Sequence, residues 1–388
     1  MSDGEQKLRV AMATAYPREN TITGGVEGVA AALAGGLAKA PGVEVHVVTC
    51  VPGLEGSAER QTSAGVTIHS VPSPGRLAWL IGYPIEARHI RRRLRDIDPD
   101  IVHCQAQTLY PYAALERGWP SLMTVHGLYL REVPLMRGWR RFQGAMLKRF
   151  ERDALRRAKH VVCISPYVTK SAGELLQGKD IRFIDNPVDD RYFDVTGDGE
   201  PERILYGGTI IGRKNLLGLL DAIKLLYTTR PNIRLRVAGT GRVEPDYYQQ
   251  CVDFVKSNGL ERNVDFLGGI SIDAMLDELS KAAMLVLPAF QETAPLIISE
   301  AQAAGRPVVA TPAGGTADMV EHGKAGMIVP FGDCQALAES IGTLLGDGGL
   351  RRRMGEHARQ EAGKRYRLSV VVEKTLQFYA DILAEAGR

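Results

Sequence analysis

Residues 287–311 read LPAFQETAPLIISEAQAAGRPVVAT, a pattern that predicts a strand end, a loop and a helix. The apolar run that ends at Leu287 predicts a short buried strand, and the residues after Pro295 predict a helix that stops at Gly305. Glu292 then lies on the loop, and Glu300 lies inside the helix, at most a turn and a half along its axis. Ligands of open α/β sheets bind beyond the C-terminal ends of the strands, so we expect both carboxylates in one crevice there.

Short apolar segments alternate with amphipathic ones along the chain, which is the pattern of parallel sheets covered by helices on both faces. The strands expected in the first half are LRVAMAT, VEVHVVT, VTIHSV, IVHC, LMTVHG, HVVCIS and IRFIDN. Those expected in the second half are RILYGG, IRLRVAG, VDFLG, MLVLPA, PVVAT and AGMIVP. Between the halves, VTGDGEPER is rich in glycine, acid and proline without periodicity, so we place the domain boundary there.

The E-x7-E spacing of Glu292 and Glu300 is accompanied by further motifs in a fixed order. These are the pair Gly24-Gly25, a strand ending in His126-Gly127, YGGTIIGRKN (206–215), AGTGR (238–242), VDFLGG (264–269) and VEHGKAGMIVP (320–330). Together they cover nearly the whole chain. The chain thus resembles the family 4 glycosyltransferases, which are retaining enzymes of the GT-B fold that use nucleotide-sugar donors.

The resemblance implies an α/β GT-B architecture, with two Rossmann-like parallel-sheet domains facing across a cleft. We expect an acceptor-binding domain at 1–194, a linker at 195–202 and a nucleotide-sugar-binding domain at 203–367. Residues 368–388 are expected to form a C-terminal helix that crosses back to the first domain.

The resemblance also assigns roles around the two glutamates. Glu292 is expected to bind sugar hydroxyls and orient the donor, and Glu300 to bind the ribose hydroxyls, because an ionised carboxylate readily accepts two hydroxyl hydrogens. The remaining donor-binding residues implied are Gly239, Gly268, Ile270, Thr293, Ala294 and Leu296. Most family members have glycine-aromatic-glycine where this chain has Thr293-Ala294-Pro295, and Pro295 has no N–H to donate to the diphosphate.

Arg213 and Lys214 are the expected cationic clamp for the donor diphosphate. Arginine binds phosphate through two N–H groups and lysine acts as a point charge, so the pair can stabilise the charge that grows on the leaving group. Many family members place this arginine where Thr209 stands here. The alternative for Arg213-Lys214 is a solvated surface pair.

Two motifs of the first half are expected to complete the site. Gly24 and Gly25 precede an amphipathic helix, where glycine lets a ligand approach the backbone closely; a tight turn without a ligand is the alternative. By the resemblance, His126 lies beside the sugar ring; a core or capping histidine is the alternative.

Several other site types are disfavoured by the sequence. No G-x-G-x-x-G follows a strand and no P-loop motif occurs, and the scattered, odd-numbered cysteines argue against a disulfide framework or a zinc site. Two overlapping D-x-D patterns at Asp96, Asp98 and Asp100 follow an arginine-rich helix, where turn chemistry explains them better than metal binding. We therefore expect no metal and no cofactor. The N-terminus lacks the apolar core of a signal peptide, and a cytoplasmic location is expected.

Basic residues are concentrated in the first half. Residues 1–195 contain 26 Lys/Arg and 21 Asp/Glu, mainly through the segments 88–95 and 137–159. In the second segment Phe142, Met146, Phe150 and Ala154 form a helical stripe with Trp139 at its start. Such a helix could rest on an anionic membrane surface at the inner membrane face, the alternative being an ordinary domain helix with a solvated basic face. Nucleic acid is not an expected partner, because the overall charge is near neutral and no recognition motif occurs.

The sequence therefore predicts a retaining hexosyltransferase. The donor is a nucleotide sugar, with a UDP-sugar favoured and GDP-mannose as an alternative, and the acceptor is a saccharide, a lipid-linked sugar or a small molecule. A nucleotide-sugar 2-epimerase of the same fold and a non-catalytic nucleotide-sugar-binding partner are the competing hypotheses.

Overall fold

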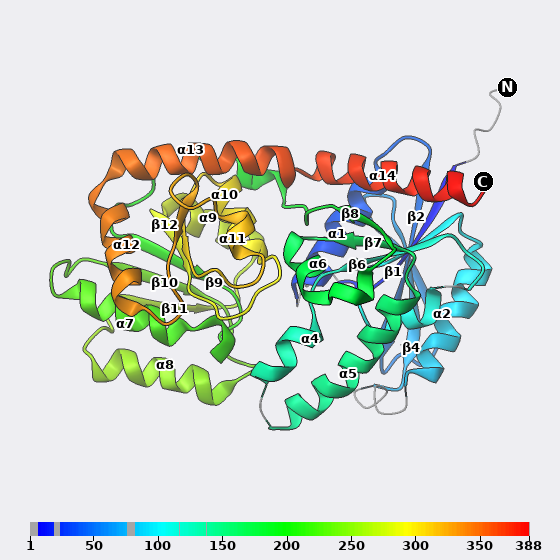
Figure 1. Ribbon diagram of the computed structural model, residues 1–388, viewed down its shortest axis with the longest axis horizontal. Coiled ribbons are helices and arrows are strands. Elements are labelled where there is room, and N and C mark those ends of the chain that lie inside the picture. The colour runs from blue at the N-terminus through cyan, green and yellow to red at the C-terminus, as the bar shows by residue number, and fades with distance from the viewer. Residues whose placement is uncertain (1–6, 19–23, 76–81, 116, 137, 388) are drawn as a thin grey trace. The chain divides into compact units, whose positions relative to one another are not determined.

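The computed structural model describes residues 7–18, 24–75, 82–115, 117–136 and 138–387, and it contains two compact α/β units (Figure 1). Unit 1 comprises Met1–Pro187 together with Leu368–Arg388, and unit 2 comprises Val188–Arg367. None of the helices in these described ranges combines the length and hydropathy needed to cross a bilayer.

Unit 1 is built on an eight-stranded sheet in the order β3-β4-β2-β1-β5-β6-β7-β8. Its strands are β1 (Leu8–Ala13), β2 (Val43–Pro52), β3 (Ala58–Gln61), β4 (Thr67–Ser73), β5 (Ile101–Cys104), β6 (Ser121–Val125), β7 (His160–Cys163) and β8 (Asp180–Phe183). All neighbouring strands are parallel except β3 and β4, which are antiparallel.

Helices cover both faces of this sheet (Figure 1). They are α1 (Gly25–Ala38), α2 (Pro84–Ile97), α3 (Leu109–Ala114), α4 (Tyr129–Glu132), α5 (Gly138–Arg157), α6 (Pro166–Ala172) and α14 (Leu368–Glu385), with 3₁₀ turns η2 (Val133–Leu135) and η3 (Gly173–Leu176). The last helix, α14, packs against α1 so closely that a Cβ on Gly36 would lie 2.7 Å from Val372 Cγ2. Its buried Phe378 and Tyr379 belong to the same apolar core as Ile101 and Leu122 of the sheet.

Unit 2 is built on a fully parallel six-stranded sheet in the order β11-β10-β9-β12-β13-β14. Its strands are β9 (Arg203–Gly207), β10 (Arg234–Ala238), β11 (Val264–Gly268), β12 (Met284–Leu287), β13 (Val308–Ala310) and β14 (Gly326–Ile328). Its helices are α7 (Leu216–Tyr227), α8 (Pro245–Ser257), α9 (Ile272–Lys281), α10 (Leu296–Ala303), α11 (Thr316–Met319), α12 (Cys334–Gly346) and α13 (Gly348–Arg365), with 3₁₀ turns η4 (Asp190–Asp194) and η5 (Gly212–Lys214). Strands such as β12 are buried on both faces, as the sheet requires.

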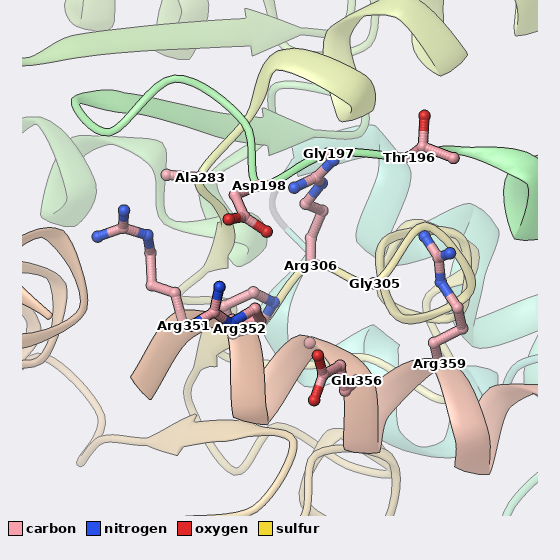
Figure 2. Close-up of a pocket in the computed structure, with 12 residues that line it drawn as sticks. Thr196, Gly197, Asp198, Ala283, Gly305, Arg306, Arg351, Arg352, Glu356 and Arg359 are labelled. Atoms are coloured by element: carbon pink, nitrogen blue, oxygen red, sulfur yellow. The ribbon is translucent and has the colours of Figure 1, made fainter. Parts of the chain in front are cut away.

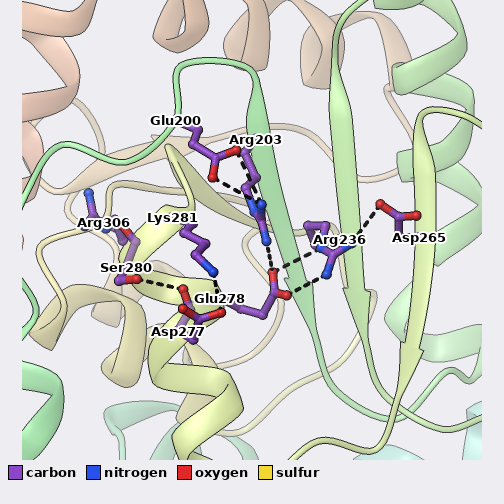
Figure 3. Close-up of polar contacts among 9 residues, drawn as sticks. All are labelled: Glu200, Arg203, Arg236, Asp265, Asp277, Glu278, Ser280, Lys281 and Arg306. Carbon is purple, nitrogen blue, oxygen red and sulfur yellow. Dashed lines mark hydrogen bonds and ion pairs between the residues drawn. The ribbon is translucent and has the colours of Figure 1, made fainter.

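A buried carboxylate joins helix α9 to the strands of unit 2 (Figure 3). Glu278 forms ion pairs with Arg203 of β9 at 2.9 Å and with Arg236 of β10 at 2.7 Å, and Arg236 also pairs with Asp265 of β11 at 2.8 Å. The two arginines replace the lost hydration of Glu278, so this network fixes the position of α9 against the sheet.

The structure confirms the predicted strands and adds one. The segment Ala58–Gln61 pairs with β4 as an exposed antiparallel strand, and its polar sequence gave no apolar signal. In helix α5, Phe142 is 49% exposed and only Ala154 of the apolar stripe is buried; the buried residues of the helix are Gly144, Glu151, Ala154 and Leu155. Arg137, at the start of the predicted basic segment, lies outside the described residues.

Candidate functional site

The loops that follow the strands of unit 2 meet at the C-terminal edge of its sheet. Backbone hydrogen bonds tie them together, from Gly208 N to Ala238 O at 2.8 Å and from Gly239 N to Gly268 O at 2.8 Å. Gly239 is required by this close approach, since a Cβ there would lie 1.9 Å from the Gly208 carbonyl oxygen. Gly268 has a φ of +69°, a left-handed conformation that favours glycine. Ile270, two residues after β11, is half-buried against the unit 2 core.

Arg213, Lys214 and Glu292 form one ion-paired cluster at this edge. Glu292 Oε1 lies 3.2 Å from Arg213 Nη1 and 3.0 Å from Lys214 Nζ, and the side chains of Glu292 and Lys214 are only 10% and 12% exposed. A Cβ on Gly208 would lie 2.6 Å from Lys214 Nζ, so the lysine extends across the end of β9. The cluster therefore holds two cations and one carboxylate, and it has a net positive charge.

Arg213 is fixed to the loop that contains Glu292. Its Nη1 donates to the Gln291 carbonyl at 2.6 Å, and its own carbonyl accepts from Phe290 N at 2.7 Å. After it, Asn215 has a φ of +54° and caps α7 by accepting from Gly218 N at 3.2 Å. These contacts hold Arg213 beside Glu292, although Thr209 occupies the position where the resembled enzymes have their arginine.

Glu300 lies on α10, whose first turn packs against the end of β9. A Cβ on Gly207 would lie 2.5 Å from Ile297 Cγ1, so the helix and the strand are in direct contact. Burial, and then the neighbouring Asp189, raise the pKa of the Glu300 carboxyl to about 7. Arg191 is itself paired with Asp189 at 2.8 Å and with Asp273 at 2.7 Å. Glu300 is thus a half-buried carboxyl that can accept hydroxyl hydrogens when it is ionised.

The loop between Glu292 and α10 contains the other predicted contacts. Thr293 is buried, while Ala294 and Leu296 are half-buried. Pro295 is the N-cap residue of α10, with a φ of −69°. The Glu292 carbonyl accepts from Gly315 N at 3.4 Å, which ties this loop to the loop after β13.

In unit 1, His126 directly follows β6 at the C-terminal edge of the other sheet. Its Nε2 lies 2.6 Å from Gln105 Oε1, and burial lowers the pKa of His126 to about 4, which a hydrogen bond to Asn186 partly offsets. The ring is therefore neutral at physiological pH. A neutral imidazole has one N–H donor and one acceptor nitrogen, which suits contact with sugar hydroxyls.

Gly24 is the N-cap residue of α1 and Gly25 is its first residue. A Cβ on Gly24 would meet no atom of the described residues within 4 Å. Helix α1 is held by the buried Val29, Ala30, Leu33 and Leu37. The residues 19–23 before it lie outside the described part of the chain.

Sequence reasoning missed the residues that support His126. Gln105 and His103 are 1% exposed, and they lie two residues apart at the end of β5. Glu151 of α5 is 0% exposed, and its two oxygens accept from Tyr129 N at 2.8 Å and Leu130 N at 2.9 Å. Glu151 thereby fixes the loop that follows His126. A signal was present, because a glutamate on the buried face of a helix requires a partner.

The predicted D-x-D residues act as turn residues. Asp98 ends α2 in a left-handed conformation, and Asp100 Oδ2 accepts from Arg9 N at 2.8 Å. These contacts link the end of α2 to strand β1.

A different hollow, of about 190 Å³, lies at the opposite edge of the unit 2 sheet (Figure 2). It is lined by residues that precede strands, such as Ala283 and Pro307, and by arginines. Arg306 donates to the carbonyls of Leu279 at 2.8 Å and Ser280 at 3.1 Å, at the end of α9. Arg351 likewise donates to Leu345 O at 3.0 Å near the end of α12. These cations cap helix C-termini, so their position has a structural explanation.

Comparison with known proteins agrees with the two-unit architecture. Residues 189–361 match the family model described as glycosyl transferases group 1, and residues 23–192 match the model described as glycosyltransferase family 4.

Individual relatives cover the chain to different extents. An α-D-kanosaminyltransferase of Streptomyces kanamyceticus is 25% identical over 79% of this chain and 82% of its own length. An exopolysaccharide phosphotransferase of Streptomyces coelicolor is 30% identical over 47% of this chain, and the match spans only 20% of that protein.

Two solved structures share the fold over almost the whole chain. Sucrose-phosphate synthase from Thermosynechococcus elongatus has a TM-score of 0.84 at 19% identity, covering 98% of this chain and 100% of that one. HepE from Anabaena, in complex with UDP, has a TM-score of 0.75 at 17% identity, covering 96% and 100%. The chain therefore belongs to the family 4 glycosyltransferases and has the two α/β domains of the GT-B fold.

Proposed function

We propose that the protein is a retaining glycosyltransferase that moves a hexose-type sugar from a nucleotide-sugar donor to a hydroxyl acceptor. The observation that most supports this is the cluster of Arg213, Lys214 and Glu292 at the C-terminal edge of the unit 2 sheet, with Glu300 on the helix that follows the Glu292 loop. Donors of this type combine a ribose, a diphosphate and a sugar. The site offers a carboxylate, two cations and a second carboxylate.

In this proposal the donor rearranges the ion pairs of the free protein. The diphosphate forms ion pairs with Lys214 and Arg213. Glu292 is then no longer paired with these cations and accepts hydrogen bonds from the sugar hydroxyls. Glu300 accepts from the ribose hydroxyls. The cations bind the leaving diphosphate more tightly as its charge grows, so they lower the barrier to reaction rather than only the donor's dissociation constant.

The reaction proposed is a front-side displacement. The bond between the anomeric carbon and the phosphate oxygen breaks, and a bond from the acceptor oxygen forms on the same face of the sugar. The acceptor's hydroxyl proton passes to the departing diphosphate. Glu292 is not assigned as a nucleophile, because it is paired with the cations that bind the leaving group.

Unit 1 is proposed to contribute His126 and the start of α1, with its glycines Gly24 and Gly25, to binding of the sugar and the acceptor. A UDP-sugar is the favoured donor, since HepE, which shares the fold, has been crystallised with UDP and with UDP-glucose. GDP-mannose remains the alternative donor. The acceptor class is a saccharide, a lipid-linked sugar or a small molecule.

Donor consumption with and without acceptors tests this proposal. A transferase consumes nucleotide sugar and releases nucleoside diphosphate much faster when a competent acceptor is present. A 2-epimerase would convert the donor without any acceptor, and a non-catalytic binder would be stabilised by the donor but consume none. Either of the last two outcomes, across a broad acceptor panel, would contradict the proposal.

We also propose that helix α5 contacts an anionic lipid surface. A hollow of about 800 Å³ beside α5 is lined by the cations Lys148, Arg149, Arg152 and Arg156 together with the apolar Met146 and Phe150. Near the start of the helix, Trp139 is 62% exposed and packs against Phe142 in a tilted arrangement, with 5.2 Å between ring centroids. Cations beside exposed aromatic residues complement the headgroups and acyl boundary of a membrane.

Charge reversal tests this contact. Arg140, Arg141 and Lys148 to glutamate should abolish pelleting with phosphatidylserine vesicles at low salt, while nucleotide affinity stays unchanged. Reversal of the exposed Arg352, Arg353 and Lys256 of unit 2 changes the net charge equally and should leave pelleting intact. Equal loss in both variants, or no pelleting of the wild type, would contradict a role for α5.

A further inference from the structure

A continuous chain of buried polar groups runs from the C-terminal helix to His126 within unit 1. Tyr379 Oη of α14 lies 2.7 Å from His103 Nδ1, His103 Nε2 lies 3.1 Å from Gln105 Nε2, and Gln105 Oε1 lies 2.6 Å from His126 Nε2. Thr124 Oγ1 joins the chain at 2.7 Å from His103 Nε2.

These side chains occupy positions where the sheet otherwise has apolar residues. Alternate residues of a strand face the same side, so His103 follows Ile101, and Thr124 follows Leu122, on the face that α1 and α14 cover. Polar groups in such a core cost free energy unless they are hydrogen-bonded. Here His103 and Thr124 stand at neighbouring strand positions, and Gln105 and Tyr379 provide hydrogen bonds to His103, which indicates a purpose beyond packing.

The chain has a defined hydrogen-bond direction. Burial lowers the pKa of His103 to about 3 and that of His126 to about 4, so both rings are neutral and each has one N–H and one acceptor nitrogen. Gln105 presents its carbonyl to His126, which places the His126 proton on Nε2. Gln105 presents its amide N–H groups to His103 Nε2, so His103 has its proton on Nδ1 and donates to Tyr379.

If the Gln105 amide flipped, so that its oxygen and nitrogen exchanged places, donor and acceptor would be exchanged in each of these hydrogen bonds. The His126 proton would then move to Nδ1. The two ring tautomers and the amide orientation are therefore coupled. His103 and Tyr379 are 1% and 0% exposed, and the cavity beside His103 is only about 10 Å³, so neither side chain can touch a substrate.

We propose that Gln105, His103 and Tyr379 are positioning residues that hold the His126 ring with its proton on Nε2. This inference rests on the proposed role of His126 in sugar and acceptor binding. In this proposal α14 influences the site indirectly, because Tyr379 orients His103, although no residue of the helix contacts substrate.

Imidazole ¹⁵N chemical shifts test the proposal without an activity assay. In the wild type His126 should show the Nε2–H tautomer, with its signals assigned from a His126→Ala variant. Gln105→Leu should shift His126 towards a tautomer mixture, and Tyr379→Phe should do so to a smaller extent. Gln105→Glu keeps an acceptor for Nε2–H and should keep the Nε2–H signature. An unchanged His126 signal in Gln105→Leu would overturn the proposal.

Kinetics then separate this proposal from the proposed function. Gln105→Leu should lower kcat by about tenfold, the order expected for one lost hydrogen bond, with an unchanged dissociation constant for nucleoside diphosphate. Thr375→Val is the matched control, because the Thr375 hydroxyl bonds only to Val371 O within α14 at 2.7 Å among the described residues, and it should leave kcat unchanged. Full kcat in Gln105→Leu beside a loss in His126→Ala would overturn the positioning role. Full kcat in His126→Ala would instead overturn the role of His126, while the ¹⁵N shifts would still show whether Gln105 sets its tautomer.

Discussion

The polar residues beyond the strand ends differ in kind between the two units. In unit 2, Arg213, Lys214 and Glu292 are ionised and paired at 3.0 to 3.2 Å. In unit 1, His126 is bound to the neutral Gln105, and burial lowers its pKa to about 4, so it carries no charge at neutral pH. A charged edge is suited to a diphosphate, and a neutral hydrogen-bonding edge is suited to hydroxyls. This contrast supports the proposal that unit 2 binds the diphosphate and that unit 1 binds hydroxyls of the sugar and acceptor.

Lys214→Ala should have the largest effect of the substitutions considered. Removal of one cation that stabilises the leaving diphosphate should lower kcat by about a hundredfold or more, with a smaller effect on donor affinity. The matched control is Lys281→Ala, which removes a surface lysine paired with Asp277 at 2.6 Å and should keep wild-type turnover. Wild-type turnover in Lys214→Ala would show that Lys214 does not stabilise the leaving diphosphate.

Glu300→Ala should act on binding instead of turnover. The ribose changes little during the reaction. Loss of the carboxylate that binds it should therefore lower the affinities for nucleoside diphosphate and for nucleotide sugar by a similar factor, about tenfold or more. Calorimetry with both ligands measures this, with the exposed Glu339→Ala of α12 as control. Wild-type nucleotide affinity in Glu300→Ala would show that the ribose binds elsewhere.

Nucleotide affinity should depend on pH through the same residue. The pKa of Glu300 is raised to about 7, so below pH 7 the carboxyl is protonated and accepts hydroxyl hydrogens less well. Affinity should therefore fall as pH decreases from 8 to 6, by up to about tenfold per pH unit below 7. Glu300→Gln cannot ionise and should flatten this part of the profile. An equally steep profile in Glu300→Gln would assign the titration to another group.

The neutral histidines of unit 1 should affect the stability of the protein at acidic pH, and we expect this effect to be the smallest. The pKa of His103 is lowered to about 3, so its contribution to stability is present above its unfolded value of about 6.5 and is lost as pH falls towards 3. Glu151 and Glu300 have raised pKa values and act in the opposite direction between about 4.5 and 7, so wild type must be compared with a variant.

Urea unfolding at pH 7 and pH 5 makes that comparison. His103→Gln should lose less stability between these pH values than the wild type, by about 1 to 2 kcal/mol at most. An identical pH dependence in the two proteins would show that folding does not lower the pKa of His103.

The sequence predicted the fold well because parallel strands buried on both faces produce short apolar runs. It missed β3, since Ala58–Gln61 is exposed and polar and pairs with a single neighbour. It did not indicate the packing face of α5, because a glycine and a glutamate, Gly144 and Glu151, occupy that face.

The candidate site was predictable where short motifs mark it and not where long-range pairing decides it. Glu292, Glu300 and Lys214 belong to local motifs, and their types suggested their chemistry. The bond between His103 and Tyr379 joins residues 276 positions apart, and a tyrosine in an amphipathic helix gives no sign of such a partner. Likewise, only the folded loops show that Arg213 pairs with Glu292 and donates to Gln291.

Hydrogen–deuterium exchange with a nucleoside diphosphate tests the central claim most directly, because it locates the ligand on the chain. At saturating UDP or GDP, we predict slower exchange in peptides covering 208–215, 239–244, 269–271 and 290–300, with much smaller changes in peptides covering 101–127. Protection confined to unit 1, or to the arginine-lined hollow around Arg306 and Arg351, would contradict the assignment of the nucleotide to the charged edge of unit 2.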